Sequence, residues 1–268
     1  MTAATPLFAA TGVAYLSSAG CSLVQLVRGG PRLDRAARVS LVVSVALHAS
    51  YVVADWLLYG GHELANIHQG LVVLSLLIPV FYLATMGRHR LKMLGAFVTP
   101  ITIVLFLGAG LRAQVAQVSP EVQGALLPFH VAANVLGIAA FALAFAAAVA
   151  YLIQESLLRH RRVGGVFQRL PPLDVLDAFG LRSVTIGFPL FTFGVITGTF
   201  WVASKAPMSV VLGYQGFGVL AWVCFGSVLL ARLAAGWRGR RAAIGTMLGF
   251  LCSMIALGGY LLRDFNRL

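Results

Sequence analysis

Histidines are the side chains of this chain best suited to ligand chemistry, and four of the six lie in or beside apolar runs. His48 lies inside the run VALHASYVVADW, His130 opens the run LLPFHVAANVLG, and His62 and His68 lie in YGGHELANIHQG between two runs. A neutral imidazole in such surroundings can ligate iron or hydrogen-bond a neighbouring helix. Because no pairs of acidic side chains accompany the four histidines, they suit haem iron better than a hard cation.

Spacing alone leaves the role of each histidine open. His48 could equally be an interior histidine that hydrogen-bonds a neighbouring helix. Asp55 lies seven residues later on about the same helical face, and its carboxylate could be hydrated. His62 and His68 are six residues apart, which is not the i, i+4 spacing of a metal pair on one helix. His48 is predicted near mid-membrane and His130 near the outer boundary. Both are tentative ligands of haem iron, but spacing alone does not identify them as an axial pair.

Signatures of catalysis are missing from the sequence. It contains no GxSxG, no Walker loop, no HExxH and no pair of carboxylates within an apolar run. The three cysteines, Cys21, Cys224 and Cys252, all fall inside apolar runs without a CxxC pattern, which is typical of packing thiols. We therefore expect a binding protein and not an enzyme, with no catalytic residues.

The elements that position the histidines are predicted from hydropathy. Apolar residues make up 59% of the 268 positions and charged residues 10%, a composition that favours lipid over water as the surrounding solvent. Apolar runs long enough to cross a bilayer lie at residues 7–27, 39–58, 70–86, 93–111, 127–153, 184–202, 210–230 and 242–262. We expect an all-α integral membrane protein with eight transmembrane helices in one domain, residues 1–268.

Positive charge is distributed unequally between the predicted loops. The first, third, fifth and seventh loops hold 16 of the 20 lysines and arginines, whereas the other loops and both ends hold only Arg112, Lys205, Arg263 and Arg267. Cytoplasmic loops retain positive charge, so both termini and the imidazole-rich side are predicted to face away from the cytoplasm, across a bacterial inner membrane. The net charge of +12 thus indicates topology and not a nucleic-acid partner.

The longest predicted loop runs from about residue 154 to 182 and is basic. It contains RLPPLDVLDAFGLRS, whose proline pair and spaced Leu and Phe residues favour a short amphipathic segment at the inner membrane surface.

From His130 to Arg241 the sequence resembles the cytochrome c assembly family that includes CcsA, CcmC and the HemX-like proteins. The resemblance depends on three stretches in this order: FHVAANVLGIAAFALAFAAAVAYLIQE, RLPPLDVLDAFGLRSVTIGFPLFTFGVITGTFW and ARLAAGWRGRRAA. It implies haem b as a cofactor, with His130 as an outer-side ligand and Trp201 as the first residue of the haem-presenting, tryptophan-rich segment. It also implies cytochrome c assembly or tetrapyrrole-synthesis proteins as partners.

Two departures from the family pattern favour its HemX-like branch. The segment after Trp201 reads WVASKAPMSVVLGYQGFGVLAW and keeps only one further tryptophan, Trp222. No histidine follows His160, so the family's outer pair of histidines is absent in its usual form. His62 or His68 would then supply the second outer ligand.

Two other functions are open to the sequence. Proline-containing helices with His48 and Asp55 inside the bundle are compatible with a small-solute transporter, although no internal repeat is detectable. The basic LPPLD loop is compatible with a scaffold or regulator that docks a cytoplasmic enzyme of tetrapyrrole synthesis.

Overall fold

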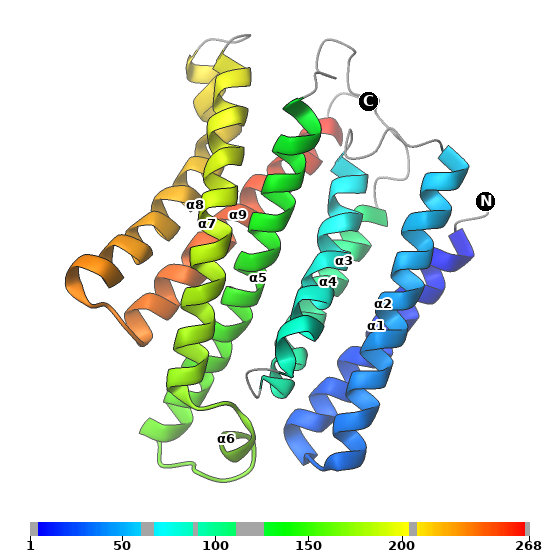
Figure 1. Ribbon diagram of the computed structural model, residues 1–268, viewed down its shortest axis with the longest axis vertical. Helices are drawn as coiled ribbons and strands as arrows, with labels where there is room; N and C mark the ends of the chain where they lie inside the picture. The colour runs from blue at the N-terminus through cyan, green and yellow to red at the C-terminus, as the bar shows by residue number, and fades with distance from the viewer. Residues whose placement is uncertain (1–4, 60–66, 88–90, 111–125, 204–207, 266–268) are drawn as a thin grey trace.

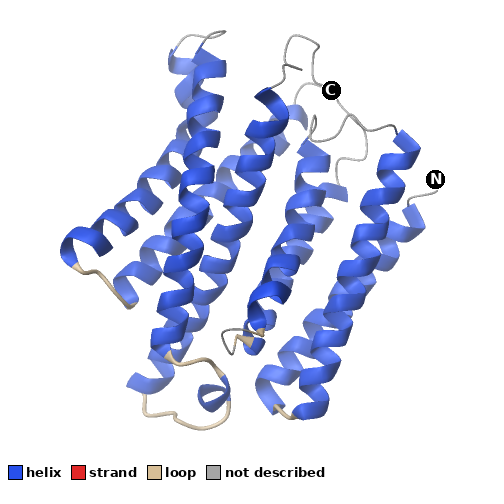
Figure 2. Cartoon of the chain, in the orientation of Figure 1, coloured by secondary structure: helices blue, strands red, loops and turns tan. Residues whose placement is uncertain are grey.

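Helices make up nearly all of the described chain. The computed structural model describes residues 5–59, 67–87, 91–110, 126–203 and 208–265, and these residues form helices joined by short turns (Figure 2). Eight of the helices are long and apolar enough to cross a membrane. This confirms the predicted all-α membrane architecture.

The helix bounds extend beyond several of the apolar runs. The spanning helices are α1 (Thr5–Arg28), α2 (Pro31–Tyr59), α3 (Ile67–Met86), α4 (Gly95–Gly110), α5 (Leu126–Arg159), α7 (Leu173–Ala203), α8 (Met208–Ala235) and α9 (Arg240–Phe265). A 3-10 turn, η1 (Lys92–Leu94), precedes α4, and the single turn α6 (Val166–Arg169) lies between α5 and α7.

The start of α7 corrects one expectation. The predicted amphipathic surface segment does not exist as a separate element, because the chain from Leu173 onward is the first part of α7. Pro172 accepts the first helical hydrogen bond, from the Leu176 amide at 3.1 Å, and Asp174 lies in the first turn, where the helix dipole favours a carboxylate. The polar residues that ended the apolar run therefore belong to the helix.

Glycines with positive φ form two of the inner turns. Gly29 (φ 67°) and Gly30 (φ 115°) end α1, and Pro31 begins α2, which matches the preference of glycine after a helix and of proline at its first position. Gly236 and Gly239 (φ 61° and 69°) form the turn between α8 and α9. These tight turns make α1–α2 and α8–α9 antiparallel hairpins.

The helices pack as four neighbouring pairs, α1 with α2, α3 with α4, α5 with α7 and α8 with α9 (Figure 1). Helix α5 is the most buried span and packs against α3, α4, α7 and α9. Its buried alanines, from Ala139 to Ala150, let neighbouring helices approach closely. Helix α5 thus joins the N-terminal helices α1–α4 to the C-terminal helices α7–α9.

Hydrogen bonds also join distant segments at the end of the bundle where α6 lies, which the positive charge predicts to be the inner, cytoplasmic end. Arg169 of α6 donates to the carbonyl oxygens of Leu26, at 3.1 Å, and of Val27. These are unpaired carbonyls in the last turn of α1. At the same end, Gln25 donates to Asp34 at 2.9 Å. The start of α1 and the end of α9 lie toward the opposite end of the bundle, which is called the outer end below (Figure 1).

Candidate functional site

His130 lies in the second turn of α5, at the outer end of the bundle, and faces α7. The ring is half-buried. Its Nδ1 lies 2.7 Å from Thr197 Oγ1 of α7, and its Nε2 lies 3.2 Å from Asn134 Nδ2, one helical turn further along α5. Each nitrogen of this imidazole therefore lies within hydrogen-bond distance of a polar side chain.

The partners of His130 fix its tautomer. Thr197 donates its only hydroxyl proton to the Phe193 carbonyl at 2.7 Å, with the Gly194 carbonyl further away at 3.2 Å. Thr197 Oγ1 must therefore accept from His130, which places the imidazole proton on Nδ1. Nε2 then carries the lone pair and accepts from Asn134. A neutral imidazole with this tautomer is a suitable ligand for a transition metal.

Glycines set the crossing of the two helices that carry this site. A Cβ on Gly187 of α7 would lie 2.9 Å from the Gly137 carbonyl oxygen, and one on Gly137 of α5 would lie 3.1 Å from the Gly187 carbonyl oxygen. The two backbones are thus in direct contact, as small residues allow between membrane helices. The crossing lies about two turns below His130 along α5 and fixes the register of His130 against Thr197.

His48 lies deep inside the N-terminal helices and is fully buried. Its Nδ1 lies 3.0 Å from the Tyr15 hydroxyl, and the Phe106 ring contacts it edge-on at 4.6 Å between centroids. Nε2 makes no hydrogen bond to the described residues, although the Val72 backbone of α3 lies near the ring. The imidazole is enclosed by aromatic side chains and has no open face.

The described contacts of His48 and of His130 come from different helices, α1, α3 and α4 for His48 and α5 and α7 for His130. His48 lies 11 residues before the end of α2, roughly 16 Å below it, whereas His130 lies four residues after the start of α5, about 6 Å from it. Helix α2 packs mainly on α1 and α3, and α5 mainly on α7, α9 and α3. Although α2 is longer than predicted, nothing in the described contacts brings the two imidazoles together.

His68 corrects a second expectation, because it belongs to the first turn of α3 and not to an outer loop. The side chain is buried, and its Nδ1 donates to the Ala109 carbonyl of α4 at 2.7 Å. Since a carbonyl only accepts, Nε2 carries the lone pair here as well. Asp55 of α2 lies close enough to interact electrostatically with His68. A helical position rigidifies this imidazole more than a loop would.

Two predicted site residues cannot be placed in the site. His62 lies outside the described residues, and the side chain of Trp201, near the end of α7, does too. Trp222, the other tryptophan of that stretch, lies inside α8 and donates from Nε1 to Thr192 of α7 at 2.8 Å. It joins two helices and does not extend an outer aromatic surface.

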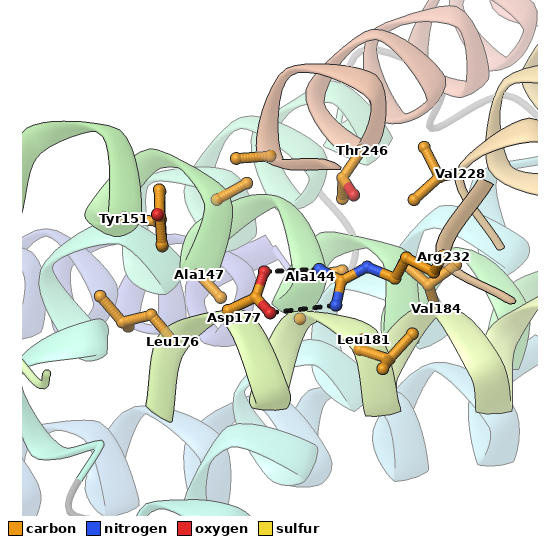
Figure 3. A pocket seen from close by; sticks show the side chains of 13 residues that line it. Ala144, Ala147, Tyr151, Leu176, Asp177, Leu181, Val184, Val228, Arg232 and Thr246 are labelled. Atoms are coloured by element: carbon orange, nitrogen blue, oxygen red, sulfur yellow. Dashed lines mark hydrogen bonds and ion pairs between the residues drawn. The ribbon is translucent and has the colours of Figure 1, made fainter. Parts of the chain in front are cut away.

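A small pocket opens between α5, α7, α8 and α9 toward the inner end. Figure 3 shows Asp177 and Arg232 paired within it, with Tyr151 and Thr246 among the lining residues. The Arg232 guanidinium donates two hydrogen bonds to the Asp177 carboxylate, at 3.0 and 2.6 Å, and the Gly239 amide donates a third at 3.1 Å. The charges of this pocket are thus used to join three helices.

The described ranges contain no group of three His, Cys, Asp or Glu side chains within reach of one ion.

Comparison with known proteins identifies the family. The family model described as cytochrome C assembly protein matches residues 64–263. The chain belongs to the cytochrome c assembly protein family. The matched range begins just before α3, so that it includes His68 and His130 but not α1 or the His48 environment of α2.

Relatives of this chain carry the name cytochrome c biogenesis protein CcsA. The chain is 28% identical to CcsA of Chlamydomonas reinhardtii over 225 residues, which covers 80% of this chain and 62% of the relative. It is 27% identical to CcsA of Heterosigma akashiwo (strain NIES-293 / 8280G21-1) over 254 residues, and 25% identical to CcsA of Synechococcus sp. (strain JA-3-3Ab) over 261 residues, covering 78% and 75% of these relatives. The chain thus spans under two thirds of the Chlamydomonas protein and about three quarters of the others.

The partners that orient these histidines were not predicted from sequence. Thr197 stands in the stretch GVITGTFW and Tyr15 in GVAYLSS. A hydroxyl among apolar residues is a signal for such a partner, because it needs a hydrogen bond in lipid. The signal does not say which distant residue it meets.

Proposed function

We propose that this membrane protein handles haem during cytochrome c assembly, with His130 as an iron ligand on the outer side of the membrane. Membership of the cytochrome c assembly family over residues 64–263 supports the process. The observation that carries the site is the hydrogen-bond chain from His130 through Thr197 to the Phe193 carbonyl, which leaves Nε2 as the lone-pair atom. The assigned role is binding and presentation, and no residue is given a catalytic role.

The donor chemistry of the outer end fits haem iron. In both His130 and His68, Nδ1 lies within hydrogen-bond distance of an oxygen acceptor, the arrangement that orients ligating histidines in metalloproteins. They lie near the outer ends of α5 and α3, which pack against each other. We therefore favour His68 as the second candidate ligand, beside His62 of the neighbouring segment.

His48 fits iron less well. A ligating imidazole needs space for the macrocycle on its Nε2 side, and the ring of His48 is fully enclosed, with Tyr15 and Phe106 in contact. We assign His48 to the packing of α1, α2 and α4.

An optical spectrum of the full chain, purified in detergent and titrated with haem b, tests the proposal. We expect a Soret band that titrates to saturation, and loss of at least tenfold in haem affinity in His130→Ala, because metal affinity depends on each ligand. His160→Ala is the matched control, since His160 lies just past the inner end of the same helix, is exposed, and bonds only the Ser156 carbonyl.

An unaltered titration in His130→Ala contradicts the assignment of the ligand, and the absence of any Soret band in the unchanged protein contradicts haem binding altogether. His68→Ala and His48→Ala complete the series. We expect a loss of affinity in the first and none in the second.

Two finer assignments follow the same proposal. We place the chain in the HemX-like branch because the stretch from Trp201 to Trp222 holds no other tryptophan. We also propose a bacterial inner membrane, with the end of the bundle that carries most of the basic residues facing the cytoplasm. Docking of a tetrapyrrole-synthesis enzyme through the LPPLD loop is less favoured. Leu170, Pro171 and Leu176 of that loop are buried, and Asp177 is paired with Arg232.

A further inference from the structure

His130 is held asymmetrically by its two polar neighbours. The Thr197 bond is short, 2.7 Å, and lies on Nδ1. The Asn134 bond is longer, 3.2 Å, and lies on Nε2, the atom that carries the lone pair. Thr197 therefore leaves the Nε2 lone pair available for coordination, whereas Asn134 donates a hydrogen bond to it.

We propose that Thr197 and Asn134 are positioning residues that make His130 a releasable iron ligand: Thr197 holds the proton on Nδ1, and Asn134 competes with iron for Nε2. This inference rests on the proposed role of His130. The competition between Asn134 and iron for Nε2 suits a site that transfers haem to a recipient and does not retain it permanently.

The orientation of the Asn134 amide follows from the chemistry around it. The same Nδ2 donates to the His130 carbonyl oxygen at 2.9 Å. Both the carbonyl and the unprotonated Nε2 can only accept, so the NH₂ end and not the oxygen of the amide must face them. Asn134 is thus a donor to the ligand atom.

Displacement of Asn134 from Nε2 is inexpensive because the amide keeps its other bond. When Nε2 binds iron, Asn134 Nδ2 still donates to the His130 carbonyl, and only one of its N–H groups loses a partner. A net hydrogen bond of this kind changes an equilibrium by roughly two- to tenfold. The competition is therefore strong enough to shift haem affinity and weak enough to be overcome.

Gly194 makes the space that Asn134 occupies. A Cβ at position 194 of α7 would overlap the amide group of Asn134. Substitution of Gly194 by alanine must push the amide away from its present place, while Asn134 and His130 themselves stay unchanged. The glycine provides a second way to remove the competing bond.

Haem affinity and haem release, measured on the full chain in detergent, test the inference. We expect Asn134→Ala and Gly194→Ala to bind haem b about two- to tenfold more tightly and to release it correspondingly more slowly to excess apomyoglobin, followed by the Soret shift. Gly180→Ala is the matched control on α7, because a Cβ there meets no atom closer than 3.9 Å, and we expect no change.

Thr197 is tested in the opposite direction. Thr197→Val keeps the shape of the side chain but removes the oxygen that accepts from Nδ1, and we expect haem affinity to fall about tenfold or more, as on loss of other outer-shell partners of ligating histidines. Thr197→Ser restores the oxygen and is expected to restore affinity. Rescue by serine separates an effect of the hydrogen bond from a change in packing.

The outcomes distinguish this inference from the proposed function. Loss of haem in His130→Ala together with unchanged or weaker binding in both Asn134→Ala and Gly194→Ala overturns the competition by Asn134 but leaves His130 as the ligand. Equal affinity of Thr197→Val and the unchanged protein overturns the role of Thr197. An unaltered haem titration in His130→Ala overturns the proposed function and this inference with it.

Discussion

At the scale of single residues, His48, His68, His130 and Trp222 inside the spans are held by partners from other helices. Tyr15 of α1 and His48 of α2 illustrate this, since their contact joins two helices within a cluster of aromatic rings that includes Phe106. In lipid an unpaired polar group cannot turn to water, so loss of one partner leaves the other unsatisfied. The Tyr15–His48 pair is therefore expected to stabilise the N-terminal helices.

Tyr15→Phe isolates this hydrogen bond, because it keeps the ring and removes the hydroxyl. We expect the free energy of unfolding to fall by about 1–3 kcal/mol, the usual penalty for a buried group left without its partner. Thermal unfolding of the detergent-solubilised protein measures it. Ser50→Ala serves as control, since its exposed hydroxyl bonds only the Ala46 carbonyl of its own helix, and a change larger than that of Tyr15→Phe would contradict the prediction.

The sequence predicts which imidazoles are unusual but not what they contact. His130 stands out because it opens an apolar run, yet Thr197 lies 67 residues away and nothing local connects the two. The sequence offers both His48 and His130 as tentative ligands, and the contacts that separate them are tertiary. Haem coordination by His130 remains a prediction.

At the scale of elements, an ion pair and glycine turns fix the C-terminal helices. Asp177 of α7 and Arg232 of α8 are nearly buried, with side-chain exposures of 16% and 10%. The Gly239 amide at the start of α9 completes the set of donors to Asp177. Three helices therefore depend on one carboxylate.

Asp177→Asn breaks the pair and leaves the Arg232 charge buried without a counter-ion. We expect a loss of about 3–5 kcal/mol of stability, as for other buried pairs that lose one member. Arg159→Gln is the control, because its bridge to Glu155 is within one helix and 62% of the arginine side chain is exposed, and such pairs contribute about 0.5 kcal/mol. Unfolding in detergent at matched ionic strength compares them, and equal losses in the two variants would refute the special role of Asp177.

The apolar runs predict how many helices span the membrane, but they do not predict the residues at which those helices begin and end. The eight spans follow from stretches of roughly 20 apolar residues, but α7 starts eleven residues before its apolar run because Asp174, Asp177 and Arg182 are helical as well. Asp177 is accommodated by Arg232, 55 residues away. A hydropathy pattern contains no information about such a partner.

At the scale of the whole molecule, basic residues gather at one end of the bundle and the candidate ligands at the other. The predicted loops that carry 16 of the 20 lysines and arginines include the turn after α1, the turn after α8 and the region of α6, which lie toward the same end of the bundle (Figure 1). The positive-inside rule then predicts that His130 and His68 lie on the non-cytoplasmic side.

Single-cysteine labelling tests this orientation. In a background with Cys21, Cys224 and Cys252 replaced by alanine, we expect a membrane-impermeant maleimide to label Phe129→Cys in intact bacterial cells, because Phe129 is exposed at the outer end of α5. Gly164→Cys, in the exposed inner segment before α6, should react only after the membrane is permeabilised. Labelling of Gly164→Cys in intact cells would reverse the orientation and remove the outer-side assignment of His130.

The backbone contact between Gly137 and Gly187 bears on how this protein can evolve. Since main-chain atoms set the register of α5 against α7, the place of the imidazole does not depend on the side chains that fill the rest of the interface. Chains that share only about a quarter of their residues with this one, as the Synechococcus relative does, can keep the same arrangement so long as these two positions stay free of a side chain. Divergence of the surrounding sequence and preservation of the ligand geometry are then compatible.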